Sequence, residues 1–227
     1  MDFLKIDHGS RESILAGFDK IADKFSRDIQ LKVNDAFYRV VDLEFYTYSN
    51  TIPDPHTYKH DEQLQSCKLY LHGSGMDITF GDGKNHGGIL LRSVVKLYDG
   101  SDKYTGFMKK QYDGPQKVAT ELFSNLKPLN SDGINEIRLI DIAGHNQDHQ
   151  FFPGASVLKT SRVGLTAKPT DPSGQYLNLN LRYLIVLKRF PAFRQTFKGI
   201  ESVLREKLKS GEMNDEEVKA ILDYSLR

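Results

Sequence analysis

Hydrophobic residues recur at helical spacing near the start of the chain and at strand spacing through most of the remaining sequence. The helical pattern predicts an amphipathic helix over about residues 11–25. Residues 29–33 and 37–48 lie on either side of Asn34-Asp35, which predicts a β-hairpin. Three short apolar stretches come next, with glycine-rich or polar segments between them, and predict further antiparallel strands: KLYLH, MDITF and ILLRSVVKL.

The second half of the chain mixes both patterns. Pro115 suits the first position of a helix over about 115–126. Strands are predicted for EIRLIDI, SRVGLTA and YLNLNLRYLIVL, and Asn214 followed by acidic residues predicts the start of a last helix. The predicted class is therefore α+β with a largely antiparallel sheet. We expect one domain over 1–190 and a helical extension over 191–227 that packs on it.

The composition fits a single globular domain, since the 227 residues are 39% hydrophobic and 27% charged. Cys67 is the only cysteine, which excludes an internal disulfide and fits a reducing compartment. The longest aliphatic run, 184–187, is far too short to span a bilayer, and the opening residues do not resemble a signal peptide. We therefore expect a soluble cytoplasmic monomer without a membrane partner.

The net charge of +1 weighs against a nucleic-acid partner, which usually requires a basic surface. The charge is unevenly spread, however. Residues 159–209 contain eleven Lys or Arg and three acidic residues, so the rest of the chain sums to −7. A phosphate-facing surface and ordinary solvated helix faces explain this basic region equally well.

The stretch DLEFYTY has unusual residues on one side of a predicted strand. Alternation places apolar residues on one face, Val41, Leu43 and Phe45. It places acids and tyrosines on the other face, Asp42, Glu44, Tyr46 and Tyr48. Neighbouring carboxylates raise the pKa of one of them, and aromatic rings hold flat ligands, so this face is suited to activating a water beside a bound ring. A plain polar sheet face is the alternative.

Two histidine pairs have a spacing that can ligate a metal on a helix. They are His56 with His60, followed by Asp61, and His145 with His149. Prolines precede the first pair and a glycine precedes the second, which argues against a helix at either place. We therefore predict no metal site.

Four sets of segments, in order along the chain, resemble a known family. The matching segments are IADKFSRDIQLKV with YRVVDLEFY, MDITF with GGILLRSV, DGPQKVATELF, and SRVGLTAK with LNLNLRYLI. They are similar to segments of the alkyladenine (3-methyladenine) DNA glycosylases, and the chain looks like a divergent branch of that family. The resemblance implies an α+β domain with a curved, largely antiparallel sheet, similar to the C-terminal barrel of formyltransferases.

Members of this family hydrolyse the bond between a damaged purine and its sugar after flipping the nucleotide out of DNA, without a cofactor. The resemblance implies that Glu44 is the general base for an attacking water and that Arg92 holds the glutamate and the water. It implies that Tyr46 stacks on one face of the flipped base. Either His56 or His60 then closes the other face.

Two positions depart from the family pattern. Asp77 stands where the family has an asparagine that helps to exclude guanine, and a carboxylate there would accept a hydrogen bond from an exocyclic amine. His72 stands near the tyrosine that wedges into the minor groove, and histidine is a poorer wedge. The predicted function is release of a modified purine from DNA. The alternatives are a non-catalytic protein that binds a nucleobase, nucleotide or RNA in the same pocket, and a scaffold that binds a partner through residues 190–227.

Overall fold

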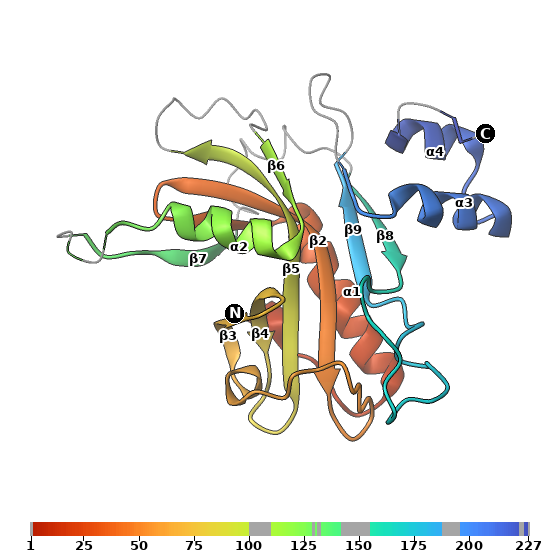
Figure 1. Ribbon diagram of the computed structural model, residues 1–227, viewed down its shortest axis with the longest axis horizontal. Coiled ribbons are helices and arrows are strands. Elements are labelled where there is room, and N and C mark those ends of the chain that lie inside the picture. Colours follow the sequence, from red (N-terminus) through yellow and green to blue (C-terminus); the bar gives the residue numbers. More distant parts are fainter. Residues whose placement is uncertain are drawn as a thin grey trace.

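The sheet is built around two long antiparallel strands, β2 and β5, which pair along most of their lengths. The computed structural model describes residues 2–99, 110–128, 130, 133–141, 155–187, 196–222 and 225–226. Within these ranges nine strands form one antiparallel sheet that curls into a half-barrel (Figure 1). The strands are β1 (Ile29–Val33), β2 (Ala36–Tyr48), β3 (Ser66–His72), β4 (Gly75–Phe80), β5 (His86–Asp99), β6 (Lys110–Asp113), β7 (Ile137–Asp141), β8 (Ser156–Thr160) and β9 (Arg182–Val186).

Each long strand has different outer partners at its two ends. On β2, residues 36–38 pair with β1 and residues 42–44 pair with β9. On β5, residues 93–96 pair with β6 and residues 88–90 pair with β4. A register shift between Val40 and Asp42 separates the two ends of β2. Bulges of this kind bend a strand and increase its twist, which explains why the sheet curls.

Helices cover the faces and one end of the sheet (Figure 1). They are η1 (Asp2–Leu4), α1 (Arg11–Arg27), η2 (Asp61–Leu64), α2 (Pro115–Ser124), α3 (Ile200–Ser210) and α4 (Asp215–Leu222). A capping box at Ser10 starts α1, in which the Ser10 hydroxyl accepts from the Ser13 N–H. The apolar face of α1 then packs on the sheet, where the Phe18 ring stacks on Phe45 with centroids 4.5 Å apart. Buried aromatic rings of this size supply much of the core.

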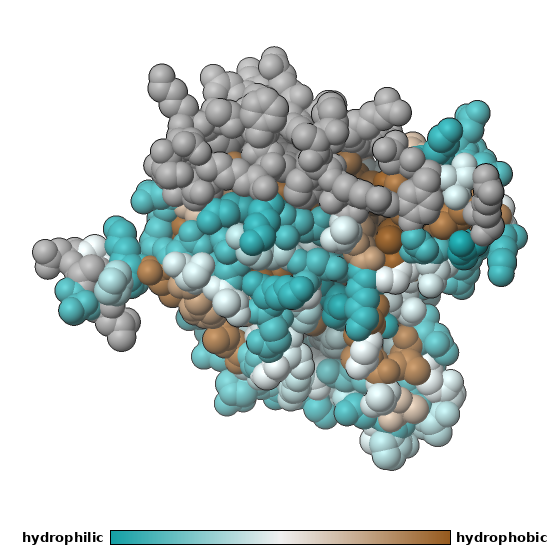
Figure 2. Space-filling model, turned by 45° about the horizontal axis from the view of Figure 1, so that its top comes forward, coloured by the Kyte–Doolittle hydropathy of each residue, from teal (hydrophilic) through white to brown (hydrophobic). Residues whose placement is uncertain are grey.

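The last two helices pack beside β9 and extend the hydrophobic core. Leu204 of α3 and Val218 and Leu222 of α4 are buried in the same cluster as the sheet residues. Hydrogen bonds between the Thr196 backbone and the Gln111 side chain join the segment before α3 to β6. The predicted boundary at residue 190 lies outside the described residues. Figure 2 shows one face of the molecule as mainly hydrophilic, with hydrophobic residues in small separate groups.

Most predicted elements are present, and the α+β class with an antiparallel, curved sheet is confirmed. The strand predicted for SRVGLTA is wrong, because β8 ends at Thr160 and residues 161–167 are irregular. Gly164 there has φ +81°, a left-handed conformation that breaks a strand. The strand predicted for YLNLNLRYLIVL is shorter, since only residues 182–186 pair. Within the described ranges, no helix is both long and apolar enough to cross a membrane.

Candidate functional site

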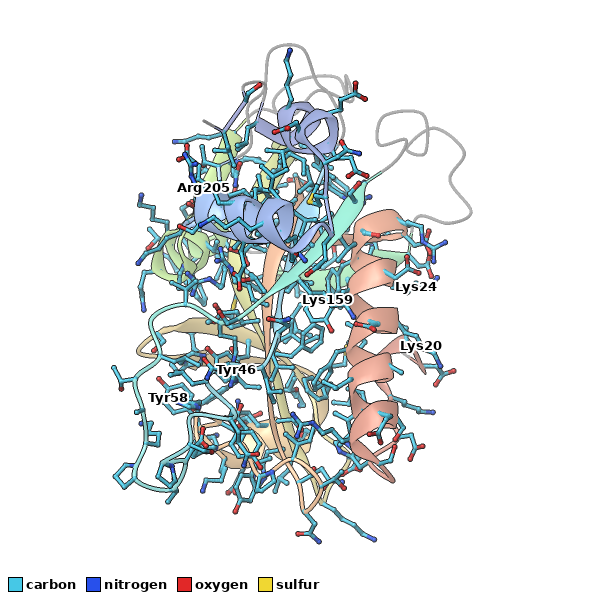
Figure 3. The ribbon with its side chains drawn as sticks, turned by 90° about the vertical axis from the view of Figure 1, so that its right-hand side faces the viewer. Lys20, Lys24, Tyr46, Tyr58, Lys159 and Arg205 are labelled. Carbon is cyan, nitrogen blue, oxygen red and sulfur yellow. The ribbon has the colours of Figure 1, made fainter. Side chains whose placement is uncertain are left out.

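The second face of β2 is buried, so it is not a plain solvated sheet face. Asp42 and Glu44 are both fully buried, and Tyr46 is partly buried. Residues 161–166, which come directly after β8, cover this face. Figure 3 shows Tyr46 together with Tyr58 on the side of the sheet opposite α1. Burial of charged groups requires partners, and each carboxylate has them.

Glu44 is held by three groups from three segments of the chain. The Tyr46 hydroxyl donates to Oε2 at 2.8 Å, and the Val163 N–H donates to Oε1 at 2.8 Å. Arg92 Nε lies 3.3 Å from Oε1. Burial raises the pKa of the Glu44 carboxyl, and the Arg92 charge and the two hydrogen bonds only partly offset that rise. A carboxylate whose pKa is raised in this way is suited to general-base catalysis near neutral pH.

Arg92 lies between two carboxylates. Its Nε is 3.3 Å from Glu44 Oε1 and 3.7 Å from Asp42 Oδ2, yet among the residues that the structure describes no acceptor meets its buried N–H with hydrogen-bond geometry. Asp42 is mainly engaged by Arg182, whose Nε and Nη2 donate at 3.0 and 2.7 Å. A buried N–H without an acceptor costs about 1–3 kcal/mol unless a water or ligand satisfies it. The unpaired donor beside Glu44 is therefore a position where a bound water would be stabilised.

Arg162 and Asp54 form a second buried ion pair against Tyr46. Arg162 Nη1 donates to Asp54 Oδ2 at 2.6 Å, and both side chains are fully buried. The Arg162 guanidinium lies over the Tyr46 ring, 4.5 Å from its centroid. This cation–π contact fixes the plane of Tyr46, and it also covers one face of the ring.

His56 extends this pair toward the pocket. Its Nδ1 lies 3.0 Å from Asp54 Oδ1, and its Nε2 lies 3.0 Å from the Thr166 carbonyl oxygen. A carbonyl oxygen accepts only, and the Asp54 carboxylate, which already accepts from Arg162, also accepts. An acceptor therefore lies next to each ring nitrogen, and the two contacts fix the orientation of the imidazole ring.

A small pocket of about 70 Å³ lies in front of Tyr46. Its lining residues include Tyr46, His56, Tyr58, His72, Asp77 and Leu165. On its far wall His72 Nε2 donates to Asp77 Oδ1 at 3.0 Å, while the His72 Nδ1 accepts from the Ser74 N–H. The second Asp77 oxygen accepts from Gln63 Nε2 at 3.0 Å. Both oxygens of Asp77 thus already have a donor within the protein.

The structure brings together most of the predicted site residues. Tyr46, His56, His72 and Asp77 line the pocket, and Glu44 and Arg92 lie behind Tyr46. Two predicted residues lie outside the pocket lining. His60 caps η2 and stacks on Tyr70, with ring centroids 4.8 Å apart. Tyr48 lies further along β2, under the Lys59 ammonium group. Of the two histidines left open by the sequence, His56 lines the pocket and His60 does not.

The histidine pairs have no metal-binding arrangement where the structure describes them. Across the described ranges, no group of three or more His, Cys, Asp or Glu side chains is placed to hold a metal ion. His145 and His149 lie outside the described residues.

Sequence reasoning missed Asp54, Arg162, Val163 and Gln63. Asp54 lies between two prolines in a polar loop, and Arg162 lies 108 residues further along the chain. The sequence does not distinguish buried charged residues from exposed ones, so only the three-dimensional contact identifies Asp54 and Arg162 as a buried ion pair. The one local signal was the Arg-Val-Gly sequence, whose glycine is typical of a turn that brings backbone close to another group.

The basic region of the sequence is partly used inside the protein. Arg162 and Arg182 are buried in ion pairs, and Lys159 pairs with Asp19 of α1. Figure 3 shows Lys159 close to α1, away from Tyr46, and Arg205 on α3 in the upper part of the view. Fewer cations therefore face solvent here than the sequence count predicts.

Comparison with known proteins shows a distant similarity. No protein-family model matches the chain. The chain is similar to "Uncharacterized protein L759" of Acanthamoeba polyphaga mimivirus, with 23% identity over 218 residues that cover 83% of this chain and 92% of that protein. This similarity extends through most of the chain but assigns no activity.

Proposed function

We propose that the protein is an N-glycosylase that hydrolyses the bond between a modified purine and its sugar in DNA. Glu44 acts as the general base for the attacking water, and Tyr46 stacks on the base. The observation that carries the proposal is the buried Glu44 carboxylate, which lies behind an aromatic pocket wall beside an Arg92 N–H that no described residue accepts. The similarity of the sequence to alkyladenine DNA glycosylases supports the same roles.

The chemistry depends on these positions. As the glycosidic bond breaks, positive charge develops on the sugar carbon, and a carboxylate close to it stabilises that charge. Glu44 would accept a proton from a water that the Arg92 N–H helps to orient. The Tyr46 hydroxyl keeps its own proton, because burial and the neighbouring Glu44 carboxylate raise its pKa. It therefore serves as a donor that orients Glu44.

The pocket has to open for this reaction. A volume of about 70 Å³ holds a few waters, whereas pockets for drug-sized ligands are about 300–1,000 Å³. Tyr58, which is 54% exposed, and Leu165, which is partly buried, lie at its edge. Entry of a purine requires them to separate.

The test is base release by wild-type protein and by Glu44→Gln. Oligonucleotides carrying alkylated or deaminated purines are incubated with each protein, and the free base is measured by chromatography. We expect release by the wild type and a loss of about 100-fold or more in Glu44→Gln, the scale of general-base catalysis. Binding of damaged DNA should survive in the variant.

Asp19→Asn is the matched control. Asp19 is also a carboxylate that accepts from a tyrosine, here Tyr183 at 2.7 Å, but it belongs to α1, on the other side of the sheet from the pocket. It should keep full base release. If the wild type releases no base from any of these substrates, the glycosylase proposal is wrong.

A second candidate is a non-catalytic protein that binds a nucleobase or nucleotide in the same pocket. The position of Glu44 favours it, since Glu44 lies behind Tyr46 and is not among the residues that line the pocket. In that case free purines would raise the melting temperature of the protein while no base is released from DNA.

A further inference from the structure

Four aromatic rings form a continuous row on the surface beside the pocket. The row runs through His60, Tyr70, His72 and Tyr58, and we refer to these four residues as the ring surface. Successive centroids are 4.8, 5.2 and 4.7 Å apart, and His60 and Tyr70 are nearly parallel, with 18° between their planes. Tyr70 and His72 belong to β3, which is an edge strand of the sheet.

The ring surface joins the outside of the protein to the pocket. Tyr58 is 54% exposed and His60 is exposed, yet Tyr58 and His72 also line the pocket. Exposed aromatic groups of this kind mark binding surfaces, and flat π-faces stack on any nucleic-acid base.

The same surface is poorly suited to opening a duplex. His72 occupies the position where the wedge is expected, but its side chain is only 6% exposed. Both of its ring nitrogens are engaged, with Asp77 and with the Ser74 N–H. A side chain held in this way cannot project between stacked base pairs, so the surface receives bases that are already unpaired.

Lysines lie on both sides of the pocket mouth. Lys59 and Lys68 are exposed next to the ring surface. On the other side, the Gln116 side chain donates to the Gly73 carbonyl and joins the β3–β4 turn to α2. Beyond this contact, exposed Lys110 and Lys117 line an open groove of about 700 Å³. These cations are enough for a few phosphates along one strand.

Acidic residues limit this electrostatic attraction. Asp61 and Glu62 lie beside the ring surface, and Asp113 and Glu121 lie along the groove. The two basic and two acidic residues on each side nearly balance. Binding therefore has to depend on stacking more than on charge, which distinguishes it from duplex binding.

We infer that the ring surface binds single-stranded DNA and leads an unpaired base into the pocket. This inference takes its substrate class from the proposed function, but the binding itself does not require catalysis. A single strand that places three phosphates near lysines would lose roughly 20-fold in affinity between about 50 and 200 mM salt, at about −0.7 in log–log slope per phosphate. A duplex should bind more weakly.

The test is fluorescence anisotropy with an unpaired oligothymidine, a duplex of the same length and an RNA single strand. Tyr58→Ala and Tyr70→Ala should each weaken binding of the single-stranded DNA by about tenfold or more, since stacking on one ring contributes about 1–3 kcal/mol per base. Tyr58→Phe keeps the ring and removes the hydroxyl that bonds Ser74, so it should bind like the wild type. Phe123→Ala, at another exposed aromatic residue on α2, is the control for the loss of a ring elsewhere.

The outcomes separate this inference from the proposed function. The inference is wrong if the duplex or the RNA binds more tightly than the DNA strand, or if folded Tyr58→Ala and Tyr70→Ala bind normally. Circular dichroism establishes that the variants are folded. Repeating the titration with Glu44→Gln shows whether binding is independent of catalysis. Stacking-dependent binding without base release would support the inference and contradict the glycosylase proposal. Base release together with normal binding by Tyr58→Ala and Tyr70→Ala would support the glycosylase proposal and contradict the inference.

Discussion

Replacing Arg162 with methionine removes the charge that neutralises Asp54. Methionine has similar length and is apolar, so the change tests the charge and its hydrogen bonds more than the volume. In the wild type, Arg162 donates to Asp54 at 2.6 Å, to the Phe45 carbonyl at 3.2 Å and to the Tyr176 carbonyl at 2.9 Å. All three acceptors would lose a partner inside the protein.

The expected cost is large because the pair is fully buried. Removing one partner of a buried ion pair costs about 3–5 kcal/mol, since the other charge is left without compensation. His56 remains beside Asp54 and limits the loss, so we expect a decrease of about 3–4 kcal/mol in the free energy of unfolding. Most domains have about 5–15 kcal/mol in total, so the variant should still fold.

Urea denaturation followed by circular dichroism measures this loss. Lys159→Met is the matched control, because Lys159 also pairs with a carboxylate, Asp19, but both side chains are nearly half exposed. An exposed pair contributes at most about 1 kcal/mol. The double variant Arg162→Met with Asp54→Asn removes both charges. Its loss in the free energy of unfolding should be smaller, by at least about 1 kcal/mol, than the sum of the losses of the two single variants. If Arg162→Met costs no more than Lys159→Met, the buried pair does not hold the site together.

Two further changes test the environment of Glu44 and the far wall of the pocket. Burial raises the pKa of Glu44 in the folded protein above its usual value. The wild type therefore loses stability as the pH rises from the usual pKa through the raised pKa, whereas Glu44→Gln has no carboxyl group at this position and lacks this loss. Relative to the wild type, the free energy of unfolding of Glu44→Gln should therefore increase between acid and neutral pH in urea titrations, and a constant difference would contradict the raised pKa. At Gly88 a methyl group would lie 2.3 Å from Asp77 Oδ2 and 2.7 Å from Gln63 Nε2, so Gly88→Ala should cost about 1–3 kcal/mol. Gly73→Ala is the control, because a methyl group there meets nothing within 4 Å, and its free energy of unfolding in urea should stay within about 0.5 kcal/mol of the wild type. Equal losses in the two variants would show that the pocket wall is not tightly packed.

The sheet could be predicted from the sequence because its strands have local patterns. Phe45 and Glu44 alternate between the α1 core and the charged face as strand geometry requires. The irregular segment at 161–167 could not be predicted, because its apolar letters resemble a strand. Its conformation is set by contacts with Glu44 and Asp54, more than 100 residues earlier in the chain.

The candidate site was predictable in part for the same reason. Tyr46 and Glu44 are two residues apart on one strand, so the sequence alone places them on one face. Arg162 and Asp54 have no such local relation. Their burial changes the interpretation of the basic region, since the Arg162 charge neutralises the Asp54 carboxylate and is not available to a phosphate.

Residues 161–166 connect access to the pocket with the acidity of Glu44. Arg162 covers Tyr46, the Val163 N–H binds Glu44, and the Thr166 carbonyl binds His56. Moving this segment to admit a base would break the hydrogen bond from the Val163 N–H to Glu44, and the loss of that bond alone would raise the pKa of Glu44. The movement would also admit water, which would lower the pKa. Burial is the largest cause of the raised pKa, so a variant that weakens this cover should bring the pKa of Glu44 back toward its usual value. In the proposed reaction, Glu44 is therefore the stronger base while residues 161–166 cover it.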